Sequence, residues 1–221
     1  MSLTLRGIKG SALTHGELDN NFLLLKGRDI VDANLDGTNL VLTKDDATTF
    51  NVDLSINSNH YLGEPYLGGV IFNLYKGSDG LEHGHVVSLT ESATTWSTVS
   101  NFEGADSSWD GISNTNNMVL ATSPAKQYVQ SLGPDWYIGA IDEINILFNS
   151  KYYVNKALSA IPGADILKES NYWSSYEYKV AYTPSPIFDP TQAWAYYMDL
   201  GFAANYNKGN PYNLVRGIKA F

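Results

Sequence analysis

Residues 171–178 read Asn-Tyr-Trp-Ser-Ser-Tyr-Glu-Tyr, and the rest of the chain is organised around this stretch. Aromatic rings set among Ser, Asn and Tyr are typical of contact surfaces, because they supply a large, fairly rigid area with a polar tip. Large rings that flank strands are more often buried, so we assign Trp173, Trp194 and Phe221 to the core. The tyrosines and amides that follow Trp173 are the candidate binding face.

This face is a mixture of tyrosine and asparagine side chains. Adaptable binding surfaces and saccharide-binding sites use this mixture, through ring stacking and amide hydrogen bonds. The residues expected to contact a ligand are Tyr176, Tyr178, Tyr196, Asn205, Tyr206, Asn207 and Tyr212.

Composition limits the classes of function that need to be considered. With 221 residues, of which 43% are hydrophobic, the chain is large enough to bury a core. The absence of Cys excludes disulfides, thiolate metal sites and thiol nucleophiles. A formal net charge of -9 without a basic cluster argues against nucleic-acid binding. No apolar run approaches the roughly 20 residues of a membrane span, so we expect no membrane insertion.

Residues 1–27 are predicted to contain a short helix that assembles the chain. Thr14 and Glu17 stand at capping-box spacing. The apolar positions that recur at helical intervals are Leu18, Phe22 and Leu25. A helix of about three turns is marginal alone in water, so its apolar face needs a partner. We favour another chain as that partner over the same domain.

Residues 28–58 are predicted to form a β-hairpin stalk, because apolar and polar positions alternate on both sides of a turn at 44–47. The apolar residues expected to share a covered face include Leu40, Leu42, Val52 and Leu54. Two or three strands are not stable alone. Three copies packed about a common axis would cover this face, and packing on the main domain is the alternative.

Residues 59–221 are expected to form an α+β domain. A glycine-led hairpin is predicted over 68–89. A helix is predicted over 123–132, with Ser123 as its cap and proline at its first position. A second helix is predicted over 141–149, where apolar residues form one stripe. Strands and helices in one domain make an α+β fold.

Between the hairpin and the first helix, residues 90–117 are predicted to be a long loop. The segment is rich in Ser, Thr, Asn, Gly and Asp. A loop of this length stays ordered when its aromatic side chains insert into a core. We expect Trp96, Phe102 and Trp109 to be these anchors.

Two segments carry resemblances to known families. Gly7 to Phe22, which reads Gly-Ile-Lys-Gly-Ser-Ala-Leu-Thr-His-Gly-Glu-Leu-Asp-Asn-Asn-Phe, resembles the opening of many bacteriophage tail-fibre and tail-structural proteins. The second resemblance rests on motifs that occur in order: Gly69-Val70-Ile71-Phe72, His83-Gly84, Asn114-Thr115-Asn116, Asp135-Trp136-Tyr137, residues 142–148, Tyr172-Trp173-Ser174-Ser175, Ala193-Trp194 and residues 215–221. Over about residues 66–221 these motifs resemble the DUF1566 family, which has a C-type-lectin-like fold. The chain departs from the family pattern at residues 138–140 and at Lys219.

These resemblances imply a function in a phage particle. We expect a receptor-binding tail-fibre protein of the virion, synthesised in the host cytoplasm, that attaches to a host cell-surface ligand, either a glycan or a protein. Its other expected partners are virion tail proteins and further copies of itself, as a trimer. The alternative is a structural virion component whose lectin-like domain only packs against its neighbours.

We expect no catalytic, cofactor or metal site. Glu177 and Glu143 could be an acid and base pair, as in glycoside hydrolysis, but an acidic residue at position 143 also suits a helix N-terminus. His83 and His85 stand two apart, a spacing that could hold a metal ion. His83 coincides with a histidine common in the resembled family, which favours a structural role.

Overall fold

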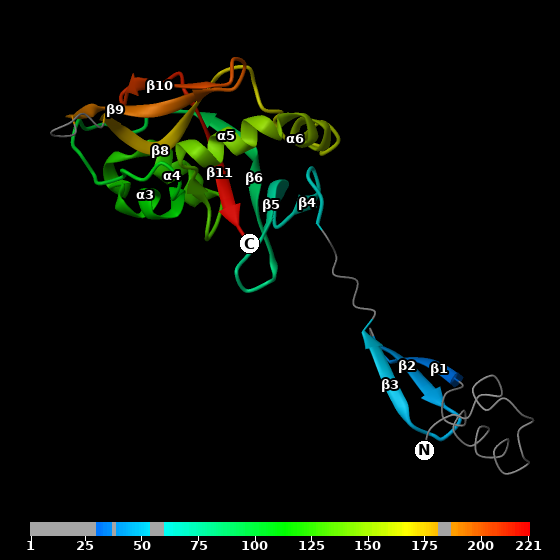
Figure 1. Cartoon of the computed structure of the whole chain (residues 1–221). Coiled ribbons are helices and arrows are strands. Elements are labelled where there is room, and N and C mark those ends of the chain that lie inside the picture. The colour runs from blue at the N-terminus through cyan, green and yellow to red at the C-terminus, as the bar shows by residue number, and fades with distance from the viewer. Residues whose placement is uncertain (1–29, 37–38, 54–59, 181–186) are drawn as a thin grey trace, which may run out of the picture. The chain divides into compact units, whose positions relative to one another are not determined.

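The computed structural model describes residues 30–36, 39–53, 60–180 and 187–221. The chain divides into two compact units, Met1–Asn59 and His60–Phe221 (Figure 1). The predicted N-terminal helix lies outside the described residues, together with Leu18, Phe22, Leu25 and Leu54.

The described part of the first unit is a three-stranded antiparallel sheet in the order β1-β2-β3. Its strands are β1 (Ile30–Asp36), β2 (Asn39–Lys44) and β3 (Thr49–Asp53). Leu40 pairs with Val52 and Leu42 with Phe50, so these four residues share one face. The predicted hairpin is confirmed as β2–β3. The strand expected over 34–43 is instead divided between β1 and β2.

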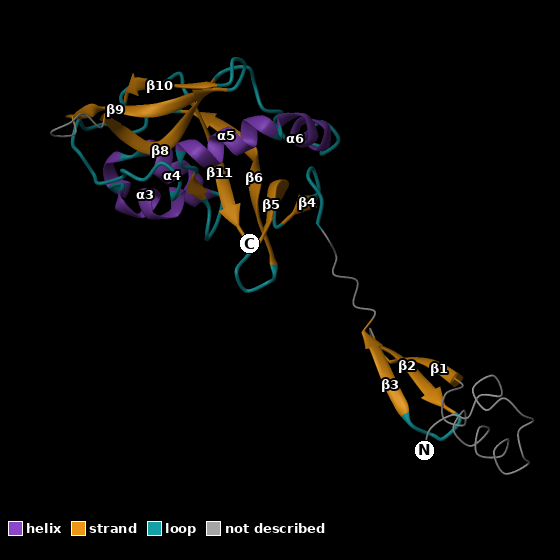
Figure 2. Cartoon of the chain, viewed as in Figure 1, coloured by secondary structure: helices purple, strands orange, loops and turns teal. Residues whose placement is uncertain are grey.

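The second unit combines an eight-stranded sheet with helices, which confirms the α+β class (Figure 2). The strand order is β10-β9-β8-β11-β6-β5-β4, and β7 pairs with β11. The strands are β4 (Pro65–Tyr66), β5 (Gly69–Lys76), β6 (Glu82–Ala93), β7 (Tyr137–Ile138), β8 (Asn171–Val180), β9 (Ile187–Tyr197), β10 (Phe202–Asn207) and β11 (Leu214–Ala220). Only β8 and β11 pair in parallel among them.

The last strand, β11, pairs with β6, a strand from the beginning of the domain. β11 lies between β6 and β8. The backbone groups of Gly84 and Phe221 exchange two hydrogen bonds of 3.0 Å. A Cβ at Gly84 would lie 2.4 Å from the carbonyl oxygen of Asn73 and 2.5 Å from the Phe221 ring, so only glycine fits here. Phe221 packs, half-buried, against the cluster of Ile71 and Trp136, as predicted for a core residue.

The helices are α3 (Gly111–Asn117), the 3-10 turn η1 (Leu120–Thr122), α4 (Pro124–Ser131), α5 (Ile141–Asn149) and α6 (Lys151–Leu158). The predictions of α4 and α5 are confirmed. The Ser123 hydroxyl caps α4 by accepting a 3.2 Å hydrogen bond from the backbone N–H of Lys126. Ile144 and Leu147 of α5 are buried.

Two helices were not predicted. α3 lies inside the expected loop and reads Gly-Ile-Ser-Asn-Thr-Asn-Asn, so no apolar stripe announces it. Its N-terminus is capped by Asp110, which accepts a 2.8 Å hydrogen bond from the backbone N–H of Ser113. α6 follows α5 after Ser150 alone, and it buries only Val154 and Leu158.

The central strands are buried on both faces. Tyr172 and Trp173 are consecutive, yet they belong to different apolar clusters. On β9, Ala195 and Tyr196 divide between the same two clusters. The cluster with Tyr172 includes residues of α5 and α6, and the cluster with Trp173 includes residues of α4. The prediction that Trp173 is a core residue is confirmed.

The segment between β6 and α3 is anchored by one of the three predicted rings. Trp96 is fully buried, and its Nε1 donates a 2.9 Å hydrogen bond to the carbonyl of Ser174. Trp109 is 71% exposed and Phe102 is 43% exposed, so the prediction that they are buried anchors is wrong.

Candidate functional site

A cluster of three rings lies on β8 and β9, and we call it, with the adjacent amides of Gln192 and Asn205, the aromatic face. The rings of Tyr176 and Trp194 are stacked, with centroids 6.4 Å apart and planes at 17°. The ring of Tyr178 is tilted against Trp194, with centroids 5.2 Å apart. All three side chains are half-buried, so each presents part of its surface to solvent.

Strand geometry places these residues together. The side chains of a strand alternate between its two faces, so Trp194 projects opposite to the buried Ala193 and Ala195. Asn205 of β10 is directly opposite Trp194 in the register. Its Nδ2 donates a hydrogen bond to Oε1 of Gln192. Rings and amides therefore form one continuous polar and aromatic surface across β8, β9 and β10.

The charges beside the aromatic face are paired. Lys179 Nζ lies 3.1 Å from Asp106 Oδ2, and this pair is partly exposed. Burial raises the pKa of Tyr176, and the nearby Asp106 and Asp142 raise it further while Lys179 lowers it. The Tyr176 phenol therefore stays neutral at physiological pH and remains a hydrogen-bond donor.

Tyr206 lies on the opposite side of β10 from Asn205. Its ring meets Trp173 edge to face at 6.3 Å, and its hydroxyl accepts a 3.0 Å hydrogen bond from Asn171 Nδ2. The hydroxyls of Tyr206 and Tyr197 are also hydrogen-bonded. Burial and Tyr197 raise the pKa of Tyr206 to about 12. The structure does not bring Tyr206 together with the tyrosines of β8.

Tyr196 is a core residue, which corrects the prediction that it contacts a ligand. It is 4% exposed and packs against Phe148 with ring centroids 5.6 Å apart. Its hydroxyl donates a 2.6 Å hydrogen bond to Asn145 Oδ1. Because β9 is buried on both faces at this point, the ring has no path to a ligand.

Asn207 is the last residue of β10, and Tyr212 lies in the turn between β10 and β11. Asn207 Oδ1 accepts a 2.9 Å hydrogen bond from the backbone N–H of Gly209. Tyr212 is 83% exposed, and its backbone N–H donates to Asn210 Oδ1. Asn207 lies opposite Gln192 of the aromatic face in the register, whereas Tyr212 has no ring contact with this face among the described residues. Of the predicted ligand contacts, the structure therefore brings Tyr176, Tyr178, Asn205 and Asn207 together.

Trp194 is the ring of the aromatic face that the sequence did not predict, because it was assigned to the core. Its ring is only half-buried and lies between the two tyrosines of β8. Its Nε1 is buried and has no hydrogen-bond partner among the described residues. The sequence did contain a signal for this position, because Trp194 stands between two alanines. Side chains alternate along a strand, so the two alanines project to one face and the large ring of Trp194 projects to the other.

Glu177 is held by partners within the domain. Its carboxylate is buried and forms an ion pair with the buried Lys208. It also accepts 3.0 Å hydrogen bonds from the backbone N–H groups of Glu103 and Ala105. Lys208 Nζ donates to the carbonyl of Asn101 at 2.7 Å. These contacts fix the segment between β6 and α3 on the sheet.

Glu143 has the capping position that its place at a helix start predicts. Its Oε2 accepts a 2.7 Å hydrogen bond from the N–H of Ala140, and its Oε1 accepts one of 2.8 Å from the Tyr137 hydroxyl. Burial raises the pKa of Glu143 to about 7. The nearest imidazole is that of His85, whose Nε2 lies 3.6 Å from Oε1. Burial lowers the pKa of His85.

The two histidines of β6 have separate partners. His83 Nε2 lies 2.9 Å from Asp79 Oδ2, and this contact raises the pKa of His83. His85 Nδ1 lies 3.1 Å from Asn73 Nδ2. Both imidazoles pack against the ring of Tyr75. Across the ranges that the structure describes, no three His, Asp or Glu side chains are grouped so that they could hold a metal ion.

No known protein family matches the chain, and no curated protein matches it significantly. Among the described residues, no helix is long and apolar enough to cross a membrane.

Proposed function

We propose that the chain is a receptor-binding protein of a bacteriophage tail fibre, and that His60–Phe221 binds a bacterial surface ligand through the aromatic face. The observation that carries this proposal is the stack of Tyr176, Trp194 and Tyr178 beside the Asn205 amide. Half-exposed rings supply rigid contact area, and the phenol and amide groups supply hydrogen bonds. A host glycan or a surface protein would be recognised in this way.

The proposed fold of this domain is C-type-lectin-like. Support comes from the ordered motifs that resemble the DUF1566 family and from the closure of the domain by its last strand. β11 lies between the early strand β6 and β8, and the backbone of Phe221 is hydrogen-bonded to that of Gly84. The helix α5 also covers the motif at residues 142–148.

The first unit would assemble the protein and attach it to the particle. Leu40 and Leu42 are half-buried, and Phe50 on the same face is 40% exposed. Three copies that cover this face about one axis would stabilise a sheet of only three strands. Several weak sites on one particle would then act together, because tethering raises the effective concentration of each.

Binding of bacterial cells and of an array of bacterial surface oligosaccharides tests the proposal. The double variant Tyr176→Ser/Tyr178→Ser should reduce binding at least tenfold, since it removes two rings from the stack. The matched control is Tyr152→Ser/Tyr153→Ser, which removes two exposed rings from α6 and should bind as the unsubstituted chain does. Equal binding by both double variants would contradict the assigned face.

The alternative role, a structural component of the virion, makes a different prediction for the assembled particle. In that role the aromatic face would be covered by a neighbouring subunit. Cross-linking from a cysteine introduced at Tyr178 would then capture another particle protein, whereas a receptor-binding face would leave that cysteine free to react with a soluble maleimide.

A further inference from the structure

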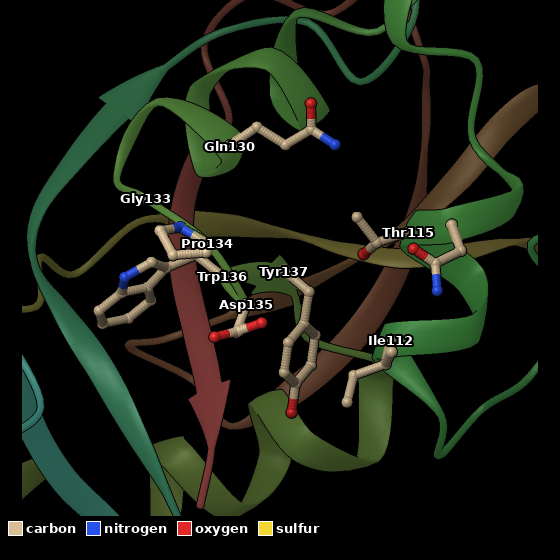
Figure 3. Close-up of a pocket in the computed structure, with 9 residues that line it drawn as sticks. Ile112, Thr115, Gln130, Gly133, Pro134, Asp135, Trp136 and Tyr137 are labelled. Atoms are coloured by element: carbon tan, nitrogen blue, oxygen red, sulfur yellow. The ribbon is translucent and has the colours of Figure 1, made fainter.

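A hollow that shares no lining residue with the aromatic face lies between α3, the end of α4 and the segment that leads into β7 (Figure 3). Its volume is about 540 Å³, within the range of pockets that enclose small organic ligands. The residues that matter for its chemistry are Ile112, Asn116, Gln130, Pro134, Asp135 and Tyr137.

Two amide side chains at this cavity are available to bind a ligand. Asn116 and Gln130 are both exposed, and neither side chain has a hydrogen bond to any residue in the described ranges. Asp135 is the one charged residue among those that line the cavity. Its carboxylate accepts hydrogen bonds but donates none, while each amide can do both. The lining therefore suits a ligand that is rich in hydrogen-bond donors.

The remaining wall is apolar and fixed. Figure 3 shows the ring of Tyr137 between Asp135 and Ile112, with Pro134 above them. The Tyr137 ring is held in place because its hydroxyl donates to the buried Glu143. A ring-shaped ligand could place an apolar face on this wall while its edge meets the amides.

Charge narrows the class of ligand. No Lys or Arg is among the residues that line the cavity, so a phosphate or carboxylate ligand finds no cation there to pair with. Lys219, which is not a lining residue, places its Nζ 3.4 Å from Asp135 Oδ2 and offsets part of the charge of that carboxylate, so a cationic ligand also gains little. A neutral ligand is favoured over either ion.

We propose that this cavity binds a neutral saccharide of one or two rings, with the Asn116 and Gln130 amides and the Asp135 carboxylate hydrogen-bonded to its hydroxyls and the exposed side chains of Ile112 and Pro134 against its apolar face. The site is independent of the aromatic face. Because few groups contact the ligand, we expect a dissociation constant on the order of 1 mM.

Saturation-transfer difference NMR on the full chain tests this proposal, with glucose, N-acetylglucosamine and cellobiose as neutral probes and glucuronic acid as the anionic one. At least one neutral probe should bind, and glucuronic acid should bind at least about tenfold more weakly. The double variant Asn116→Ala/Gln130→Ala should weaken the neutral probe about tenfold. This variant should fold normally, because both side chains are exposed and make no hydrogen bond with the described residues.

Two further variants separate this site from others. Ile112→Trp fills the cavity and should abolish the transfer signal, while Tyr152→Ser on α6 should leave it unchanged. The proposal is overturned if none of the neutral probes binds or if glucuronic acid binds best. It is also overturned if Tyr176→Ser/Tyr178→Ser removes the signal while Asn116→Ala/Gln130→Ala does not, since the saccharide would then occupy the aromatic face.

Discussion

Replacing Lys208 by Met should destabilise the second unit severely, because it breaks a buried ion pair. The side chains of Lys208 and Glu177 are each 1% exposed. Removing one partner of such a pair costs about 3–5 kcal/mol, because the other charge stays buried without compensation. Lys208 Nζ also lies 4.4 Å from the centre of the Trp96 ring, a contact worth about 1 kcal/mol that methionine would lose.

Part of this loss is offset. The Glu177 carboxylate keeps its hydrogen bonds from the N–H groups of Glu103 and Ala105. We therefore expect Lys208→Met to lower the free energy of unfolding by about 3 kcal/mol, near the low end of the range. The double variant Lys208→Met/Glu177→Gln removes both charges, and the glutamine oxygen can still accept from these N–H groups. It should lose only about 1 kcal/mol, because no uncompensated charge remains.

Urea denaturation followed by tryptophan fluorescence measures these free energies, and the buried Trp96 beside Lys208 makes the signal sensitive to this site. Lys179→Met is the matched control. It breaks the partly exposed contact with Asp106 and should cost less than about 1 kcal/mol. A cost below about 1 kcal/mol for Lys208→Met would refute the reasoning. So would a double variant whose loss equals the sum of the losses measured for Lys208→Met and for Glu177→Gln alone.

Three other substitutions test separate parts of the domain. Burial raises the pKa of the Glu143 carboxyl group from 4.5 to about 7, so the folded state binds the carboxyl proton more tightly than the unfolded state does. The protonated carboxyl group therefore contributes its full stability below pH 4.5, and this contribution is lost as the pH rises through about 7. Glu143→Gln should therefore remove up to about 3 kcal/mol of pH dependence between those values, and thermal melts from pH 4.5 to 8 with an unchanged slope would contradict this. Gly84→Ala should cost at least about 2 kcal/mol in urea denaturation, because its Cβ would lie 2.4 Å from the Asn73 carbonyl oxygen; a neutral result would show that β5 and β6 can separate there. Ser123→Ala should cost about 1–2 kcal/mol by the same assay, since it removes the α4 cap and a 2.6 Å hydrogen bond to the Trp96 carbonyl, and wild-type stability would exclude a capping role.

The sequence was most informative where a local pattern and a cap agree. α5 has an apolar stripe and acidic residues in its first turn, and its bounds of Ile141–Asn149 match the prediction. α3 has neither a stripe nor a strong helix-forming composition. It is held by contacts with distant residues, such as the 3.2 Å hydrogen bond from Asn114 Nδ2 to the hydroxyl of Ser175. Local periodicity carries no information about such contacts.

The candidate site was predictable only in part, for a similar reason. Alternation along β9 shows that Trp194 and Tyr196 point to the same side, but it does not show where α5 covers that side. Phe148 and Asn145 of α5 cover Tyr196. Trp194 meets the tyrosines of β8 instead and stays half-exposed. Whether a ring on such a strand belongs to the core or to a surface depends on the length and position of a helix elsewhere in the chain.

The aromatic face and the buried ion pair are coupled through one strand. Glu177 lies between Tyr176 and Tyr178 on β8, so its inward carboxylate sets the outward direction of both rings. The backbone N–H of Glu177 also donates a 2.8 Å hydrogen bond to the carbonyl of Ala105, which fixes the strand against the preceding segment. A change at Lys208 should therefore weaken ligand binding as well as folding, although Lys208 is itself 1% exposed and out of a ligand's reach. If Lys208→Met binds surface ligand normally at temperatures where it remains folded, the positions of the two tyrosines do not depend on this ion pair.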